Sequence, residues 1–249
     1  MSIEVLPDEE TLALRAADLF ALVAQEAAAA RGRFAVALGG GATPRRFFEL
    51  LARQQFSQKI PWRRTHIYWG DERCVPADDP ASNYGLARDT FIKHVPVPVA
   101  NVHRVRGEEQ PERAADLYDG ELRAMAALQR PKTELPVFDL VMLGLGLDGH
   151  TASLFPHSPA LEEEERLAVA TPAPDGSSRV TVTYPVINAA RYVWFLVGGA
   201  AKAGMVAEVI EGLRVPKAVP AQAVAPVHGK LLWLLDEAAA TELNPALRL

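Results

Sequence analysis

Two hydrophobic patterns alternate along the chain. Longer segments carry apolar residues at helical spacing, and the first of them begins at Asp8 and closes at Gly32. Short apolar runs without polar alternation separate these segments and are typical of strands covered on both faces. We expect helices at residues 8–31, 44–53, 83–93, 111–130 and 200–211, and strands at residues 34–38, 65–69, 180–183, 192–197 and 231–235, with one more strand ending at Gly144.

This alternation predicts the fold class. Helices that alternate with strands give a mostly parallel sheet with helices on both faces, so we expect an α/β fold. The chain has no internal repeat and no flexible linker. Residues 214–229 contain Pro216, Pro220 and Pro226 and are too apolar for a free tether. Residues 1–249 are therefore expected to form a single domain.

Composition and charge exclude several classes of protein. Hydrophobic residues make up 49% of the 249 residues, which is enough for a full core and excludes a disordered chain. The net charge is 26 − 31 = −5 and the basic residues are scattered, so no nucleic-acid surface is expected. Cys74 is the one cysteine, which excludes an internal disulfide and favours a reducing compartment.

The expected location is the cytoplasm. The first residues lack the basic and apolar regions of a secretory leader, and no apolar run approaches membrane-spanning length. We therefore expect no membrane partner. Because the net charge is negative, an anionic ligand must be held by local positive groups.

The most informative stretch is residues 138–156, where a buried-strand pattern ends in glycines that precede a histidine. Gly144, Gly146 and Gly149 let the backbone approach a ligand closely, and His150 follows them at the expected carboxyl edge of the sheet. An imidazole titrates near neutral pH and can face a cleft from such a turn, so His150 is a candidate general base. A capping or core role for this ring is the alternative.

The same glycines match the G-x-G-x-x-G pattern of dinucleotide-binding proteins. We discount this match because it lies in the middle of the chain and Pro156 leaves room for only a short helix. No acidic residue ends a strand about 20 residues further on, where the ribose of a dinucleotide would be bound. No dinucleotide cofactor is therefore expected.

A second glycine loop joins a strand to a helix. Consecutive glycines precede Ala42 and Thr43, and Thr43 is expected at the N-cap of the helix. Free amide N–H groups and the positive end of the helix dipole make this turn a natural phosphate site, with Gly40 and Gly41 as candidate ligands. The alternative is a tight turn without a ligand.

Charged residues in other loops are candidates for substrate binding. Asp71 and Arg73 belong to a charged triplet that follows an apolar strand. Arg179 begins a strand, and Lys202 begins a helix after two glycines, where an oxyanion can bind. For each of them the alternative is an ordinary surface charge, either solvated or paired with a carboxylate.

Taken together, these loops resemble the 6-phosphogluconolactonase family, within a superfamily that includes glucosamine-6-phosphate deaminases. The resemblance spans nearly the whole chain, and it is the order and spacing of the motifs that make it specific. It rests on residues 39–44, residues 69–76 with Ser82, Asn83 and Tyr84, residues 144–156, residues 179–183 with Ile187 and Asn188, residues 198–202 and residues 233–236.

The resemblance implies a Rossmann-like fold and hydrolysis of 6-phospho-D-glucono-1,5-lactone to 6-phosphogluconate, a step of the oxidative pentose phosphate pathway. It implies a phosphosugar lactone as substrate and no metal or organic cofactor. We expect a monomer or a small homo-oligomer. By position, the resemblance makes His150 the catalytic histidine, residues 40–43 the phosphate loop, Arg73, Arg179 and Lys202 the substrate-contacting cations, and Asp71 and Asp148 the loop aspartates.

Three positions separate this chain from its relatives. Ala42 stands where serine is common, and His157, where glycine is frequent, is a candidate for the mouth of the pocket. The deaminase pattern resembles Asp-Gly-His followed five residues later by a glutamate that assists ring opening, whereas this chain has Phe155. A phenyl ring cannot relay a proton, which favours lactone hydrolysis over deamination.

Two residue roles and one further function class stay open. Asp148 either orients the His150 ring or caps a short helix beginning at Gly149. Asp71 either contacts sugar hydroxyls or positions Arg73. A non-catalytic sugar-phosphate sensor is the remaining alternative, and it is disfavoured because no basic helix-turn-helix pattern flanks the chain.

Overall fold

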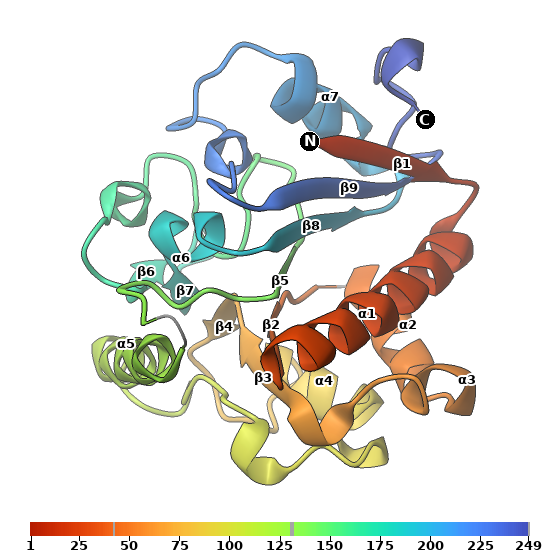
Figure 1. Cartoon of the computed structure of the whole chain (residues 1–249). Coiled ribbons are helices and arrows are strands. Elements are labelled where there is room, and N and C mark those ends of the chain that lie inside the picture. Colours follow the sequence, from red (N-terminus) through yellow and green to blue (C-terminus); the bar gives the residue numbers. More distant parts are fainter. Residues whose placement is uncertain (42, 130–131, 249) are drawn as a thin grey trace.

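A six-stranded sheet forms the centre of the molecule (Figure 1). The computed structural model describes residues 1–41, 43–129 and 132–248. All neighbouring strands of this sheet run parallel. In spatial order they are β1 (Ser2–Leu6), β9 (Lys230–Asp236), β8 (Tyr192–Val197), β5 (Leu140–Leu143), β2 (Phe34–Leu38) and β3 (Thr65–Trp69).

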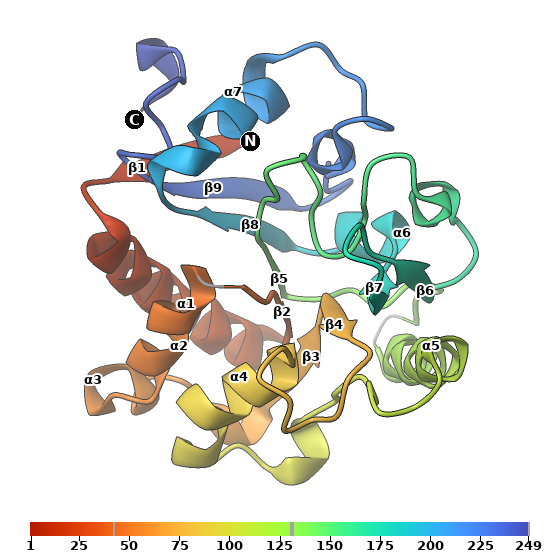
Figure 2. The ribbon, with the colours of Figure 1, turned by 180° about the vertical axis from the view of Figure 1, so that it is seen from behind.

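Helices cover both faces of this sheet (Figures 1 and 2). Alternate side chains of β2 enter different cores, since Val36 packs with α1 and α2 whereas Ala37 packs with α5. A strand buried on both faces has no polar alternation, which is why β2 and β5 read as unbroken apolar runs. The helices are α1 (Glu9–Arg31), α2 (Thr43–Leu51), α3 (Gln54–Ser57), α4 (Asn83–Thr90), α5 (Pro111–Leu128), α6 (Tyr184–Asn188) and α7 (Ala203–Glu211). Across the described residues, none of these helices has the length and apolar character needed to span a bilayer.

A small antiparallel sheet stands beside the end of β3 (Figure 2). Its strands, in spatial order, are β4 (Asp71–Arg73), β7 (Ser178–Val182) and β6 (Ala168–Pro172). Gly70 links β3 to β4, and its carbonyl accepts a hydrogen bond of 2.8 Å from the backbone N–H of Val182. The small sheet therefore lies next to the carboxyl ends of the strands of the large sheet.

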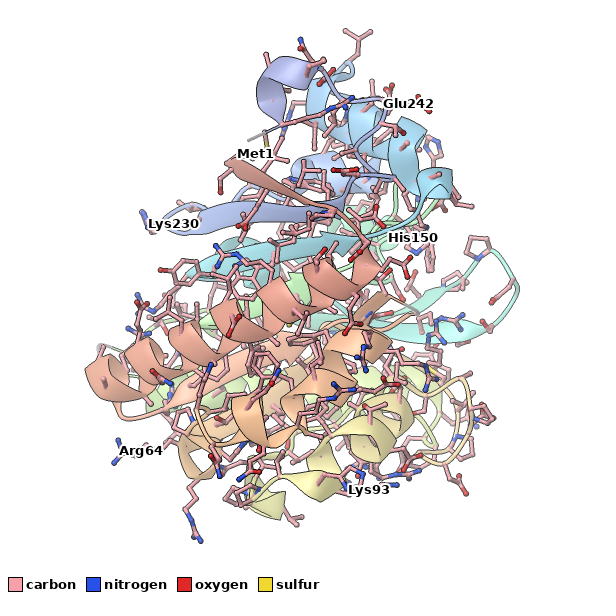
Figure 3. All side chains as sticks on the ribbon, turned by 90° about the vertical axis from the view of Figure 1, so that its right-hand side faces the viewer. Met1, Arg64, Lys93, His150, Lys230 and Glu242 are labelled. Atoms are coloured by element: carbon pink, nitrogen blue, oxygen red, sulfur yellow. The ribbon has the colours of Figure 1, made fainter. Side chains whose placement is uncertain are left out.

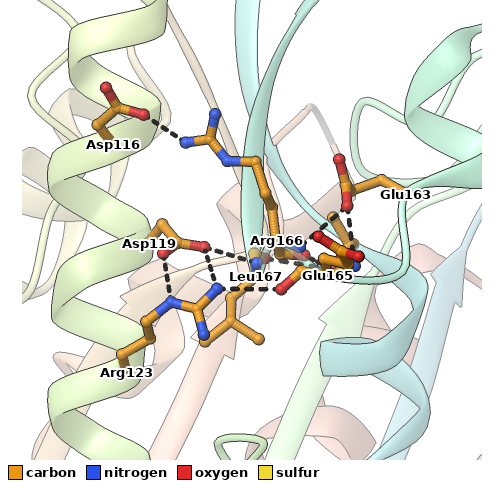
Figure 4. A network of polar contacts seen from close by, with 8 residues as sticks. Asp116, Asp119, Arg123, Glu163, Glu165, Arg166 and Leu167 are labelled. Atoms are coloured by element: carbon orange, nitrogen blue, oxygen red, sulfur yellow. Dashed lines mark hydrogen bonds and ion pairs between the residues drawn. The ribbon is translucent and has the colours of Figure 1, made fainter.

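A polar network fastens this small sheet to α5 (Figure 4). Asp119 accepts hydrogen bonds from the guanidinium of Arg123 and from the backbone N–H of Leu167, both at 2.7 Å. Arg166 pairs with Asp116 one turn earlier on α5. These contacts hold the segment that precedes β6 against α5.

The predicted α/β class with a mostly parallel sheet and helices on both faces is confirmed. The predicted bounds of β2, β3 and β8 match the structure, but β1 and β6 were not predicted. The charged triplet 71–73, expected as a loop, forms β4 because it pairs with β7. No helix begins at Gly149, since residues 149–157 form turns and an isolated bridge between Thr151 and Leu154.

Candidate active site

A cleft of about 610 Å³ opens at the carboxyl ends of the central strands. The strands β2 and β5 are neighbours, but the chain leaves β2 towards β3 and leaves β5 towards β8, so the strand order reverses between them. Connections that diverge from adjacent parallel strands leave a crevice, which is where ligands bind in such sheets. The segment after β2 forms one wall of the cleft and the segment after β5 forms another.

The structure places all of the described candidate residues around this cleft. They are Gly40, Gly41, Thr43, Asp71, Arg73, Asp148, His150, Arg179 and Lys202. Ala42 lies outside the described residues. Figure 3 shows His150 at the opposite end of the sheet from Lys230, the first residue of β9, as the expected carboxyl edge requires.

The His150 ring is fixed by a carboxylate two residues earlier. Its Nδ1 lies 2.5 Å from Oδ1 of Asp148, and the backbone N–H of His150 donates to the same oxygen at 3.2 Å. A carboxylate only accepts hydrogen bonds, so the proton of the neutral ring lies on Nδ1 and Nε2 keeps a lone pair. The ring also packs against Phe155, with 4.7 Å between the centroids.

Asp148 interacts with His150 and does not cap a helix. Partial burial acts to raise the pKa of the Asp148 carboxyl, but the hydrogen bonds from the His150 side chain and backbone outweigh it and lower this pKa below its ordinary value. The carboxylate thus stays ionised beside the imidazole. The helix-capping alternative is wrong, because turns follow Gly149 and no helix does.

Two glycines shape the loop that carries His150. A Cβ on Gly146 would overlap Nδ1 of the His150 ring and Oδ1 of Asp148, so only glycine leaves room for this pair. Gly149 has a φ of +81°, in the left-handed region where glycine is unstrained. The backbone N–H of Gly146 donates to the His150 carbonyl at 2.8 Å, which closes the loop on itself.

The glycine loop after β2 leads directly into α2. Gly41 has a φ of +100°, and Thr43 is the first residue of the helix and not its N-cap, so the helix begins earlier than expected. A Cβ on Gly40 would overlap the side-chain amide of Asn83, which packs against the loop. The amide N–H groups of a helix's first turn have no partner within the helix, so this end of α2 presents donors to the cleft.

Arg73 and Arg179 face the cleft from neighbouring strands of the small sheet. Nη1 of Arg73 donates to the carbonyl of Ala81 at 2.7 Å, and its buried Nε has no partner among the described residues. The guanidinium of Arg179 pairs with Asp175 at 3.1 Å and also donates to Ser177. Both cations are oriented by the protein and keep further donors for an anion.

Lys202 is the N-cap residue of α7 and lines the cleft. Partial burial lowers the pKa of Lys202 below its ordinary value, while the negative charge of Asp148 acts in the opposite direction. A partly desolvated ammonium gains more from an incoming anion than a fully hydrated one.

The charged triplet also contains Glu72, a buried residue that the sequence analysis did not select as a site residue. The carboxylate of Glu72 accepts hydrogen bonds from three backbone N–H groups at 2.7 Å, those of Arg73, Asn83 and Tyr84. Burial raises the pKa of Glu72, against the effect of these hydrogen bonds. Glu72 joins β4 to the first turn of α4.

Asn83 and Ser153 line the cleft and were not predicted as site residues. Both hydrogen-bond to Asp71, which is 8% exposed. The signal available for them was their position inside the resembling motifs 82–84 and 144–156. Nothing in their local patterns showed that they would meet the same carboxylate.

His157 does not line the cleft, so its expected place at the pocket mouth is wrong. The residue is exposed and has a φ of +60°, in the left-handed region. Glycine adopts this conformation without strain, so the backbone at this position favours glycine over histidine.

The cleft and its loops define an α/β protein of the doubly wound class, with a carboxylate-paired histidine and several cations at its switch point. Residues 7–233 match the family described as "Glucosamine-6-phosphate isomerases/6-phosphogluconolactonase". The chain belongs to this family. Of the residues the structure describes, no three histidine, cysteine or acidic side chains cluster in a way that would hold a metal ion.

Named relatives match over nearly the full length of the chain. The 6-phosphogluconolactonase of Nostoc sp. is 41% identical over 98% of both chains, and that of Mycobacterium tuberculosis is 40% identical over 97% of this chain and 98% of the relative. The structure of the 6-phosphogluconolactonase from Trypanosoma brucei superposes with a TM-score of 0.86, at 28% identity and 98% coverage of both chains. A monomeric glucosamine-6-phosphate deaminase shares the fold with a TM-score of 0.81 at 19% identity.

Proposed function

We propose that the protein hydrolyses 6-phospho-D-glucono-1,5-lactone to 6-phosphogluconate, within the oxidative pentose phosphate pathway. The 6-phosphogluconolactonases that match it over almost their entire length support this substrate. The observation that carries the proposal is the His150–Asp148 pair in the same cleft as the glycine loop at the start of α2. The His150–Asp148 pair activates water, and the glycine loop binds the phosphate.

The phosphate is anchored at the side of the cleft where α2 begins. The loop amides at Gly40, Gly41 and Thr43 supply neutral donors, and Lys202 and Arg179 supply positive charge. Such an anchor fixes the lactone so that C1 lies beside His150. Because the reacting atoms are then preoriented, remote binding lowers the barrier by up to several kcal/mol.

His150 acts as the general base through Nε2. As water attacks C1, Nε2 accepts a proton from it, and Asp148 stabilises the imidazolium that forms. The tetrahedral intermediate then collapses with cleavage of the bond between C1 and the ring oxygen. Nε2 returns the proton to that oxygen, which yields the open-chain acid.

The former carbonyl oxygen carries negative charge in the intermediate. The guanidinium of Arg73, which lines the cleft, is the donor that we assign to it, together with a backbone amide near Gly146. This step needs only a base and an oxyanion donor, so the proposed reaction uses no metal or organic cofactor.

The decisive test is an assay with lactone made in situ from glucose 6-phosphate. Acid production should rise above the spontaneous rate with the protein, and His150→Ala should lower kcat on the order of 10²-fold or more with little change in KM. An unchanged kcat in this variant would show that another group is the base. Acid production at the spontaneous rate with the unmodified protein would refute the proposed function.

Deamination of glucosamine 6-phosphate is the competing reaction within the family. Phe155 argues against it, because its 8% exposed ring packs on His150 where a proton-relaying carboxylate would be needed. Ammonia release from glucosamine 6-phosphate, without lactone hydrolysis, would favour the deaminase. Binding of the phosphosugar without turnover of either substrate would favour the sensor.

The remaining expectations are part of the same proposal. We propose that residues 1–249 act as one domain, as a monomer or a small homo-oligomer, in the cytoplasm. Lactone hydrolysis should be unaffected by a chelator.

A further inference from the structure

Three polar side chains form a buried group in the wall of the cleft. Asp71, Asn83 and Ser153 are 8%, 3% and 1% exposed. Ser153 Oγ donates to Oδ2 of Asp71 at 2.7 Å, and Asn83 Nδ2 donates to the Asp71 carbonyl at 2.9 Å and to Oδ1 at 3.3 Å. Both oxygens of this buried carboxylate are therefore engaged by the protein itself.

Asn83 connects this group to the glycine loop. Its side-chain amide occupies the space that a Cβ on Gly40 would need, so the two residues are in direct contact. Asn83 is itself fixed as the first residue of α4, where its backbone N–H donates to Glu72 at 2.7 Å. Because its backbone is held in this way, the Asn83 side chain fixes the position of Gly40.

Ser153 connects the same group to the loop that carries the base. It lies three residues after His150, and its backbone N–H donates to Oγ1 of Thr181 at 3.2 Å. The chain from Gly40 through Asn83 and Asp71 to Ser153 therefore joins the phosphate side of the cleft to the His150 side.

We propose that Asn83 is a positioning residue that, through Gly40 and Asp71, fixes the distance between the phosphate anchor and His150. This inference rests on the proposed lactonase function. In the proposed substrate a short CH2–O arm joins the phosphate to a stiff lactone ring, so a shift of one anchor relative to the other moves C1 away from Nε2. Small misplacements of this kind lower the rate far more than they weaken binding.

The test compares Asn83→Ala with Asn188→Ala. Asn188 is a matched control because it also uses its side chain to bridge backbone groups, those of Ala223 and Ala225, and does not line the cleft. Asn83→Ala should lower kcat by about 10-fold to 100-fold, whereas its Kd for inorganic phosphate should change by less than about 3-fold. Asn188→Ala should lower the melting temperature without lowering kcat.

A double-mutant cycle tests the contact itself. Gly40→Ala alone should lower kcat because its Cβ meets the Asn83 amide. In the Asn83→Ala background the added Cβ has room. The loss of kcat caused by Gly40→Ala should therefore be at least about 5-fold smaller there than in the unmodified protein. Ser153→Ala, which removes one hydrogen bond from Asp71 and no atom near Gly40, should also lower kcat more than it raises KM.

The outcomes separate the two proposals. If the unmodified protein hydrolyses the lactone and Asn83→Ala keeps its kcat, or if the cycle is additive, the positioning role is wrong and the proposed function stands. A parallel loss of kcat and phosphate affinity would assign Asn83 to phosphate binding and also overturn the role. If the unmodified protein leaves the lactone intact, both proposals fall.

Discussion

One hydrogen bond determines which nitrogen of His150 is free to act as the proposed base. Oδ1 of Asp148 accepts a hydrogen bond from Nδ1–H at 2.5 Å, so the lone pair that would accept a proton from water in the proposed reaction belongs to Nε2. Without this carboxylate the ring could adopt either tautomer and would lose the charge that balances an imidazolium.

Asp148→Asn tests this arrangement. When the amide nitrogen of an asparagine faces Nδ1, it donates to that atom, which moves the ring proton to Nε2, and the substitution also removes the negative charge. We expect kcat to fall by roughly 10²-fold or more and KM to change little. Steady-state kinetics on the lactone measures both, with the exposed Asp78→Asn as control. Retention of more than about half of kcat would show that Asp148 does not set the tautomer.

His157 offers a second prediction at this scale. Its φ of +60° strains a residue with a Cβ, whereas glycine takes this conformation freely. His157→Gly should therefore raise the free energy of unfolding by about 0.5–1 kcal/mol, as measured by urea denaturation. His94 is also exposed but is not in the left-handed region, so His94→Gly should destabilise the protein. A loss of stability in both variants would contradict the strain argument.

At the scale of elements, a buried carboxylate holds a strand against a helix. Glu72 in β4 satisfies two backbone N–H groups in the first turn of α4, those of Asn83 and Tyr84, and also accepts from Ser82 Oγ at 3.1 Å. This contact places Asn83 beside Gly40. It therefore supports the cleft without lining it.

Glu72→Gln should weaken this junction. The amide nitrogen of glutamine would face N–H donors, which leaves at least one buried donor unsatisfied, and the expected loss in the free energy of unfolding is about 1–3 kcal/mol. Urea denaturation gives this value, and Glu109→Gln on the exposed surface should change it by less than about 0.5 kcal/mol. Equal stability of the two variants would mean that water or a rearranged Ser82 satisfies the donors.

Elements buried on both faces could be predicted from the sequence, and edge elements could not. The unbroken apolar runs of β2 and β8 identify them directly. The edge strand β1 buries fully only Ile3, and β4 is a run of charges that becomes a strand through pairing with β7. Their strand character depends on tertiary partners that no local pattern contains.

The same limit applies to the candidate site. Glycine turns next to apolar strands indicated the loops around Gly40 and His150, because local backbone geometry demands glycine there. Asn83 and Ser153 are polar residues whose proposed importance comes from a shared contact with Asp71, although 70 residues separate them in the sequence. Such contacts follow from the fold and are invisible in composition or periodicity.

At the scale of the whole molecule, stability should depend on a pair of stacked histidines. Burial lowers the pKa of His66 to about 4, with help from the positive charges of His103 and Arg33. Nδ1 of His66 lies 3.2 Å from Nε2 of His103, whose other nitrogen is 3.5 Å from Glu121. Tyr68 stacks on the His103 ring. None of these side chains lines the cleft.

The sign of the pH effect follows from this lowered pKa. Between pH 6.5 and about 4 the unfolded chain binds a proton at His66 and the folded protein does not, so the free energy of unfolding falls as the pH drops. Because the ring is half-buried and partly screened, we expect a loss of about 1–2 kcal/mol. Urea denaturation of His66→Gln at pH 7 and pH 4 should show a smaller decrease than the wild type. An identical decrease would show that groups other than His66 cause the loss of stability at low pH.

The contact between β2 and the residue before β5 also limits how early the nascent chain can fold. The backbone N–H of Ala35 bonds to the carboxylate of Asp139, a partner 104 residues later. A ribosome must therefore complete most of the polypeptide before the two walls of the crevice can meet. A nascent fragment that ends before Asp139 would carry the glycine loop after β2 but not His150, the proposed base, so the proposed turnover should begin only late in synthesis.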